Sequence, residues 1–205
     1  MKISRISALL LAAALSLSAA AGCSDEKDTS SASVILEKPQ ATTYAVSPDG
    51  KLEGMAENVQ EASFAQQTEM NDTLFTLNKV VDSGKRTDAG EKYIYLDVTI
   101  ENPTDKEYAL NMLNNFYVLF DDGSETHYDV RTQLYAAKNL TGYTASPFNV
   151  PAQGSFTGLI GGFLIPAETN SFTVCFFPSL DNDKDKSNVI KVPVTSDNIT
   201  KLDTQ

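Results

Sequence analysis

The stretch from residue 93 to residue 101 alternates between apolar residues and polar or tyrosine residues. Its apolar positions are Ile94, Leu96, Val98 and Ile100. Because successive side chains of a β-strand point to opposite faces, this period of two predicts a strand with one buried face. The turn-forming sequence Asn-Pro-Thr-Asp at 102–105 then ends the strand. The rest of the chain must supply partner strands and a layer that covers the apolar face.

Short apolar segments separated by turn residues continue along the chain. Further strands are expected at 74–81, 116–120, 156–165, 172–177 and 188–194. After the Asp-Asp-Gly-Ser turn at 121–124, residues 126–130 can return antiparallel, and a short helix over 131–140 can cross one end. This pattern predicts an all-β fold, an antiparallel immunoglobulin-like β-sandwich. The chain has no tryptophan, so the Cys…Trp…Cys pattern of antibody domains is excluded.

The first 22 residues have the layout of a secretory signal peptide. Lys2 and Arg5 give a basic start, and residues 6–21 form an apolar stretch before Gly22 and Cys23. A stretch of about 16 residues is shorter than the roughly 20 that a membrane-spanning helix needs. We therefore predict that residues 1–22 are removed during export.

The sequence Ala20-Ala21-Gly22-Cys23 resembles the lipobox of bacterial lipoproteins, although most lipoboxes have Leu where this chain has Ala20. The resemblance implies that the thiol of Cys23 takes a lipid. The protein would then be lipid-anchored at the cell membrane or outer surface, outside the cytoplasm. The alternative is an ordinary signal peptide cut near Ala21, with no role for Cys23.

Charge and cysteine content limit the partners of the mature chain. Removing residues 1–22 takes away Lys2 and Arg5, so 14 basic and 27 acidic side chains remain, for a formal charge of −13. Such a chain is expected to repel nucleic acid and anionic lipid, and neither is an expected partner. If Cys23 carries a lipid, Cys175 has no cysteine left to pair with.

The chain divides into an N-terminal part and a folded domain. Residues 23–67 are poor in large apolar side chains and show no sustained period. Such a segment cannot bury enough surface to offset the cost of ordering, so a lipidated N-terminus and flexible spacer are predicted. A short helix over 53–67 is an alternative for its last part. The β-sandwich is expected to occupy residues 68–205.

Three stretches carry a resemblance to a known family: 90–105, 116–128 and 151–166. Together they resemble a bacterial immunoglobulin-like domain of unknown function that is common in lipoproteins. That family is related in fold to telokin-like domains and to a mycobacterial secreted immunogenic antigen. The resemblance spans residues 68–195 and implies a β-sandwich outside the cytoplasm. It implies no catalytic residues, and the long stretch 134–149 departs from the family pattern.

A catalytic triad would have to use the single histidine. His127 lies in a predicted strand, where a place on a solvent or edge face is the ordinary expectation. A dyad of His127 with Cys175 is conceivable. However, Cys175 lies within the apolar strand 172–177, where an inert buried thiol is expected. No catalytic residue is therefore predicted.

Two acidic clusters are candidate metal sites. The run Asp-Asn-Asp-Lys-Asp at 181–185 starts like a calcium loop, but Lys186 and Val192 stand where that loop needs Gly and Glu. A solvated loop is expected, with weak calcium binding as the alternative. The acids Asp121, Asp122 and Glu125 have turn chemistry. We predict no metal and no cofactor.

Two further patterns have a structural and a functional interpretation. Gly158, Gly161 and Gly162 lack the context of a phosphate loop, so a β-bulge or a close backbone approach is expected. Tyr93 and Tyr95 point away from the apolar face of their strand. They can form a recognition surface, or they can cover the sheet and pack beneath 134–149.

The sequence favours a non-enzymatic binding or protein-interaction module of the bacterial cell envelope. Its expected partners are the membrane, through lipid on Cys23, and an extracytoplasmic protein or small ligand of unknown identity. A structural or envelope-scaffolding lipoprotein is the alternative. An enzyme or metal carrier is less favoured, because one histidine offers little catalytic chemistry.

Overall fold

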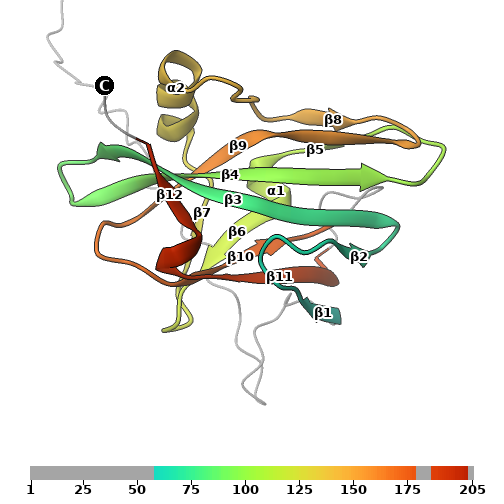
Figure 1. Ribbon diagram of the computed structural model, residues 1–205, viewed down its shortest axis with the longest axis horizontal. Coiled ribbons are helices and arrows are strands. Elements are labelled where there is room, and N and C mark those ends of the chain that lie inside the picture. Colours follow the sequence, from blue (N-terminus) through green and yellow to red (C-terminus); the bar gives the residue numbers. More distant parts are fainter. Residues whose placement is uncertain (1–57, 179–185, 203–205) are drawn as a thin grey trace, which may run out of the picture. The chain divides into compact units, whose positions relative to one another are not determined.

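The computed structural model describes residues 58–178 and 186–202 (Figure 1). These residues lie within one unit of the chain. Several sequence-based predictions lie outside the described residues. They are the signal peptide 1–22, the lipid site Cys23, the spacer as far as residue 57 and the acidic run 181–185.

The described residues form twelve strands, two α-helices and one 3-10 turn. The strands are β1 (Asn58–Glu61), β2 (Thr68–Met70), β3 (Thr73–Arg86), β4 (Glu91–Asn102), β5 (Tyr108–Leu110), β6 (Phe116–Leu119), β7 (Glu125–His127), β8 (Phe148–Val150), β9 (Gly154–Pro166), β10 (Phe172–Phe176), β11 (Asn188–Val194) and β12 (Ile199–Lys201). The helices are α1 (Met112–Asn115) and α2 (Val130–Asn139), and the 3-10 turn is η1 (Ser196–Asn198).

The strands pair into two main sheets and a small one. One sheet has the order β1-β11-β10-β6-β7, and the other has the order β12-β3-β4-β9 with β2 beside β3. Strands β5 and β8 form a separate pair. Pairing is antiparallel except for β1 with β11 and β12 with β3. The predicted all-β, antiparallel sandwich is confirmed, with two parallel pairs added at the sheet edges.

The core lies between the two main sheets. The alternating apolar positions of β4, Ile94 to Ile100, are all fully buried. Phe75 of β3 stacks on Phe176 of β10 at 4.6 Å, and Phe116 of β6 stacks on Phe176 at 4.8 Å. Because these rings come from both sheets, they join the layers, and burial of this apolar surface drives the packing.

The helix expected over 131–140 is confirmed as α2, and the strand before it is shorter than expected. Strand β7 pairs antiparallel with β6 but ends at His127. Asp129 is the N-cap of α2, and its carboxylate accepts a hydrogen bond from the backbone N–H of Arg131. This cap starts the helix at Val130, so the strand cannot continue to that residue. Within the described residues, neither helix is long and apolar enough to cross a bilayer.

The alternative of a short helix over 53–67 is wrong for the described part of that range. Asn58–Glu61 form β1, which pairs with β11 in register from Asn58 with Asn188. The Asn58 side chain also donates a hydrogen bond to Asn188 Oδ1 at 3.0 Å. Sheet pairing therefore begins before residue 68. Because β1 and its partner β11 are far apart in sequence, no local pattern indicates that they pair.

Candidate functional site

The outer face of the β12-β3-β4-β9 sheet is covered at one end. Figure 1 shows α2 above the end of β4 and β9 where β3 turns into β4. Tyr93 and Tyr95, on that face of β4, are 7% and 0% exposed. Tyr135 of α2 meets Tyr93 edge-on at 5.5 Å, and Tyr143 meets Tyr95 at 6.0 Å. The recognition surface considered for Tyr93 and Tyr95 is therefore wrong, and their packing beneath 134–149 is confirmed.

A glycine bulge in β9 lies against β4 next to the start of α2. The register of β4 with β9 shifts between Ile94 and Tyr95, and Gly162 is the extra residue. A Cβ atom on Gly162 would overlap the carbonyl oxygen of Ile94. The predicted β-bulge and close backbone approach are confirmed at this glycine.

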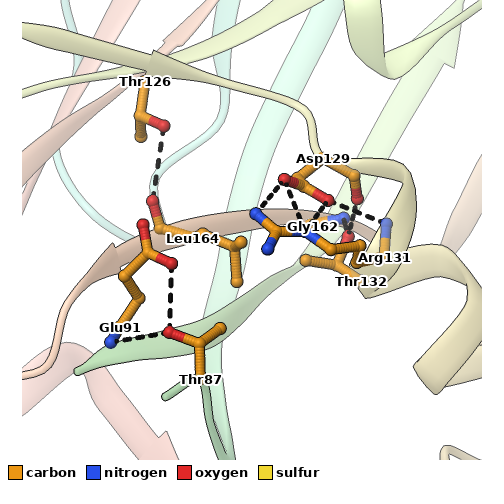
Figure 2. Close-up of polar contacts among 8 residues, drawn as sticks. All are labelled: Thr87, Glu91, Thr126, Asp129, Arg131, Thr132, Gly162 and Leu164. Carbon is orange, nitrogen blue, oxygen red and sulfur yellow. Dashed lines mark hydrogen bonds and ion pairs between the residues drawn. The ribbon is translucent and has the colours of Figure 1, made fainter. Parts of the chain in front are cut away.

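Buried hydrogen bonds hold the first turn of α2 on this bulge. The fully buried hydroxyl of Thr132 donates to the carbonyl of Asp129 at 2.5 Å and accepts from the N–H of Gly162 at 2.8 Å (Figure 2). The N–H of Asp129 donates to the carbonyl of Gly162 at 3.1 Å. From strand β4 of the sheet, the Tyr95 hydroxyl donates to the carbonyl of Thr132 at 2.8 Å. The helix start is thus fixed by polar groups that solvent does not reach.

Two more tyrosine hydroxyls fix the segment around α2. Tyr128 donates to Gln133 Oε1 at 2.6 Å, and the N–H of Ser146 donates to the same oxygen at 3.2 Å. Tyr143, beyond the helix, donates to the carbonyl of Gly161 at 2.6 Å. The helix is therefore bound to β9 both through its own residues and through the loop after it.

The other face of α2 is exposed. At about 100° per residue, Thr132 and Ala136 face the sheet, so Val130, Leu134 and Lys138 face away. Val130 is 56% exposed and Leu134 is 65% exposed. A helix that is bound so firmly on one side while showing large apolar side chains on the other is a candidate contact surface.

A hollow of about 410 Å³ lies between the β3–β4 hairpin and the first turn of α2. We call it the hairpin hollow. It is lined by Lys85, Arg86, Thr87, Asp88, Ala89, Glu91, Tyr93 and Arg131. Figure 2 shows Thr87 and Glu91 on the hairpin side and Asp129 and Arg131 on the helix side. Together with the exposed face of α2, the hairpin hollow forms the candidate site.

Carboxylates hold both arginines of the hairpin hollow. Arg131 donates from Nε to Asp129 Oδ1 at 3.0 Å and from Nη2 to Oδ2 at 2.7 Å, and these hydrogen bonds hold the pKa of Asp129 below its usual range. Arg86 binds Asp82 with both terminal nitrogens, at 2.8 and 2.9 Å. Such paired contacts fix the plane of a guanidinium group, so its remaining donors point in set directions.

The charges beneath the hairpin are buried. Burial opposes ionisation of Asp82, which is 1% exposed, but hydrogen bonds from Arg86 and from the N–H of Gly84 outweigh it, and the pKa of Asp82 lies below its usual value. Lys92 is also buried, which lowers the pKa of its ammonium group, and Nζ donates to the carbonyl of Thr169 at 2.6 Å. These groups hold the base of the hairpin together.

His127 and Cys175 do not form a dyad. Tyr117 of β6 pairs with His127 on one side and with Cys175 on the other, so a whole strand separates them. Two strand spacings amount to about 9–10 Å. His127 is exposed beside Glu125, whereas Cys175 is fully buried, and burial raises the pKa of its thiol to about 11.

The acids near the β6–β7 turn lie where turn chemistry places them. Asp122 accepts from the N–H and the hydroxyl of Ser124, and these hydrogen bonds hold its pKa below the usual range. Asp121 accepts from the hydroxyl of Ser171 at 2.8 Å. Among the residues that the structure describes, no group of three His, Cys, Asp or Glu side chains is suited to hold a metal ion.

With this geometry described, comparison with known proteins gives one decisive match. The family model named Domain of unknown function (DUF4352) matches residues 63–186. The chain belongs to this family. The DUF4352 segment contains β2 to β10, both helices and every residue of the hairpin hollow, whereas β1, β11 and β12 lie outside it.

Three solved structures resemble this DUF4352 protein. They are yjhA from Bacillus subtilis (16% identity, 63% of this chain and 98% of that one, TM-score 0.44), ycdA from Bacillus subtilis, described as a proposed lipoprotein (11%, 66% and 40%, TM-score 0.46), and an uncharacterized beta-sandwich protein from Clostridium difficile 630 (14%, 70% and 99%, TM-score 0.41). No curated protein matches the chain.

Sequence reasoning missed the hairpin hollow of the DUF4352 domain. The strand expected over 74–81 stops short of Asp82 and Arg86, whereas β3 continues to Arg86. Asp129 lies just before the predicted helix. Because aspartate is a common N-cap residue, it could have indicated where the helix starts. Nothing local to the sequence indicates that Arg131 and the hairpin lie together.

Proposed function

We propose that this DUF4352 protein is a lipid-anchored, non-enzymatic binding or protein-interaction module of the bacterial cell envelope. Partners are bound at the hairpin hollow and along the exposed face of α2. The anchor is lipid on Cys23, as the lipobox-like sequence Ala20-Ala21-Gly22-Cys23 predicts. The relation in fold to telokin-like domains and to a mycobacterial secreted antigen stays a prediction.

One observation carries the proposal of a binding surface. The α2 helix is fixed to the sheet by buried hydrogen bonds through Thr132 and Tyr95, yet it leaves Leu134 65% exposed. A contact surface that is rigid before binding loses little conformational entropy when a partner arrives. Apolar side chains beside charged, oriented guanidinium groups are a common composition for such surfaces.

The placement of the nucleophilic and basic groups supports a function without catalysis. A cysteine nucleophile needs a base within hydrogen-bond reach, and His127 lies two strands away from Cys175. The raised pKa of Cys175, about 11, also keeps its thiol protonated at neutral pH. The two arginines of the hairpin hollow are paired with carboxylates.

The test compares binding of envelope fractions by the full lipidated chain and by variants. Arg131→Ala and Leu134→Ala should each weaken binding, because they remove a charged and an apolar contact of the site. The matched controls are Thr99→Ala at a partly buried position and Lys106→Ala at an exposed one, both away from α2, and they should bind like the parent. Equal loss in all four variants would contradict this site.

The same preparation tests the absence of catalysis. His127→Ala and Cys175→Ala should bind envelope fractions as the parent does, and alanine avoids burying an unpaired hydroxyl at position 175. Broad hydrolase screens should stay blank for the parent. A hydrolytic activity that disappears in either variant, with the fold intact, would overturn the non-enzymatic proposal.

A further inference from the structure

Charge is unevenly distributed along the β12-β3-β4-β9 sheet. The end where Leu74 pairs with Glu101 carries five acids and one lysine, and we call it the acidic end. Its charged residues are Glu69, Asp72, Glu101, Asp105, Lys106 and Glu107. The local sum of formal charges at this end is −4.

The opposite end of the same sheet, which we call the α2 end, is slightly basic. It comprises the β3–β4 hairpin and α2, with cations Lys85, Arg86, Lys92, Arg131 and Lys138 against acids Asp82, Asp88, Glu91 and Asp129. The local sum is +1, in a mature chain of −13. Four of these cations, all but Lys92, are exposed, whereas Asp82 is buried and Asp129 is partly buried.

The two ends are far enough apart to act separately. Strand β4 runs from Glu91 to Asn102, about 40 Å at roughly 3.3 Å per residue. The Debye length in physiological salt is about 8 Å. A charged surface close to one end of the sheet is therefore screened from the charges of the other end.

The α2 end also carries apolar side chains suited to a lipid surface. Val130 and Leu134 lie one helical turn apart, and Arg131 and Lys138 lie on the same side of α2. Apolar side chains between Lys and Arg on a helix face are the composition with which helices lie in the interface of anionic bilayers.

We propose that the α2 end rests on the anionic surface of the membrane that holds the lipid anchor. Leu134 and Val130 contact the headgroup boundary, while Lys85, Arg131 and Lys138 lie against lipid phosphates. This proposal rests on the proposed function: it names the bilayer, in place of a protein, as the occupant of the site at α2, and it needs the lipid tether to keep the domain close to the bilayer. The net charge of −13 still repels an anionic surface, and this repulsion turns the acidic end outward.

The test uses the absence of tryptophan from the chain. Leu134→Trp places the single tryptophan of the chain on α2, where it can be excited selectively, and Leu113→Trp is the matched control on α1, since Leu113 is 64% exposed. The lipidated proteins are reconstituted into vesicles of phosphatidylcholine, with or without phosphatidylglycerol. With phosphatidylglycerol, the emission of the Leu134→Trp variant should shift to shorter wavelength and brominated lipid should quench it. The emission of the Leu113→Trp variant should stay unchanged.

A charge reversal distinguishes the two ends. In the Leu134→Trp background, Lys138→Glu should abolish the emission shift, because it removes a cation from the α2 end. Lys106→Glu makes the same chemical change at the acidic end and should leave the shift intact. Equal effects of the two reversals would contradict an oriented contact.

The outcomes separate failure of the anchor from failure of the docking. Protein that does not float with vesicles contradicts the lipid anchor, and the docking proposal falls with it. Protein that floats without an emission shift at position 134 contradicts the docking alone. Equal shifts at positions 134 and 113 contradict the orientation. An emission shift in native envelope vesicles but not in pure lipid vesicles would contradict the docking on lipid and would show that an envelope protein contacts the α2 end.

Discussion

The outer face of strand β4 has two different halves. At the α2 end, Tyr93 and Tyr95 are buried beneath the helix and its loop. Toward the acidic end, Asp97, Thr99 and Glu101 occupy the same face and are only partly buried. There the polar side chains bond to one another: Asn78 donates to Asp97 at 3.2 Å and to Thr99 at 3.0 Å.

The difference shows that one half of a strand face can line a second core while the other half stays at the solvated surface. Tyrosine fits both roles, because its ring can be buried while its hydroxyl finds a partner. Tyr95 does so through the carbonyl of Thr132. The change of environment therefore comes from the segment packed on the face, and the predictions below ask how much each half contributes.

The largest expected difference is between Tyr95→Ala and Thr99→Ala. Tyr95 is fully buried, and Tyr95→Ala removes both the packing of its ring and its hydrogen bond. The substitution should therefore lower the free energy of unfolding by about 3–5 kcal/mol. Thr99→Ala should change it by less than about 0.5–1 kcal/mol. Urea unfolding measures both. Similar losses would mean that α2 adds no second core.

A second comparison lies within β9. Gly162→Ala would place Cβ against the carbonyl oxygen of Ile94, and the strand must shift, at a cost of about 1–3 kcal/mol or more. At Gly158, a Cβ would meet only side-chain atoms of Phe156 and Thr144, which can move, so Gly158→Ala should cost less. Thermal unfolding of both variants gives the order. A costlier Gly158→Ala would contradict the role given to the bulge.

Removing one buried hydroxyl tests how α2 is held. Thr132→Val keeps the shape but leaves the N–H of Gly162 without its acceptor, which should cost about 1–3 kcal/mol. Hydrogen exchange should become faster in α2, while Asp97–Glu101 stays unchanged. Faster exchange spread evenly over the sheet would show that Thr132 serves the whole fold and not α2 alone.

The smallest expected effect is on pH dependence. Asp82 has a lowered pKa in the folded state, so its charge stabilises the fold above the unfolded value of about 3.9, and this contribution is lost as pH falls through the folded value. The stability gap between the parent and Asp82→Asn should therefore narrow below about pH 4. Urea unfolding between about pH 3 and pH 6 measures the gap, with Asp97→Asn as the control for losing one carboxylate. A constant gap would contradict the account.

The parts of the fold that depend on local pattern could be predicted from the sequence. The alternation at Ile94–Ile100 indicated which face of β4 is buried, and the apolar run with its Asp-Asp-Gly turn indicated the β6–β7 hairpin. The helix after Asp129 followed from the same kind of pattern. These features can be predicted because side-chain period and turn chemistry depend only on residues close together in sequence.

The candidate site could not be predicted, because it depends on contacts between distant segments. Arg131 lines the hairpin hollow because the start of α2 is hydrogen-bonded to Gly162 of β9. Strand β1 likewise needs the edge of β11. Whether Tyr95 is covered or exposed depends on the same packing, so the sequence left both interpretations open.

Hydrogen exchange of the unmodified, lipid-anchored protein tests the central claim most directly. The claim is that the α2 end is the contact surface and the acidic end is not. In vesicles that contain phosphatidylglycerol, exchange should slow in the hairpin 85–91 and in α2 relative to pure phosphatidylcholine, while Asp97–Glu101 should not change. Slower exchange at Asp97–Glu101, or no change in either region, would contradict the claim.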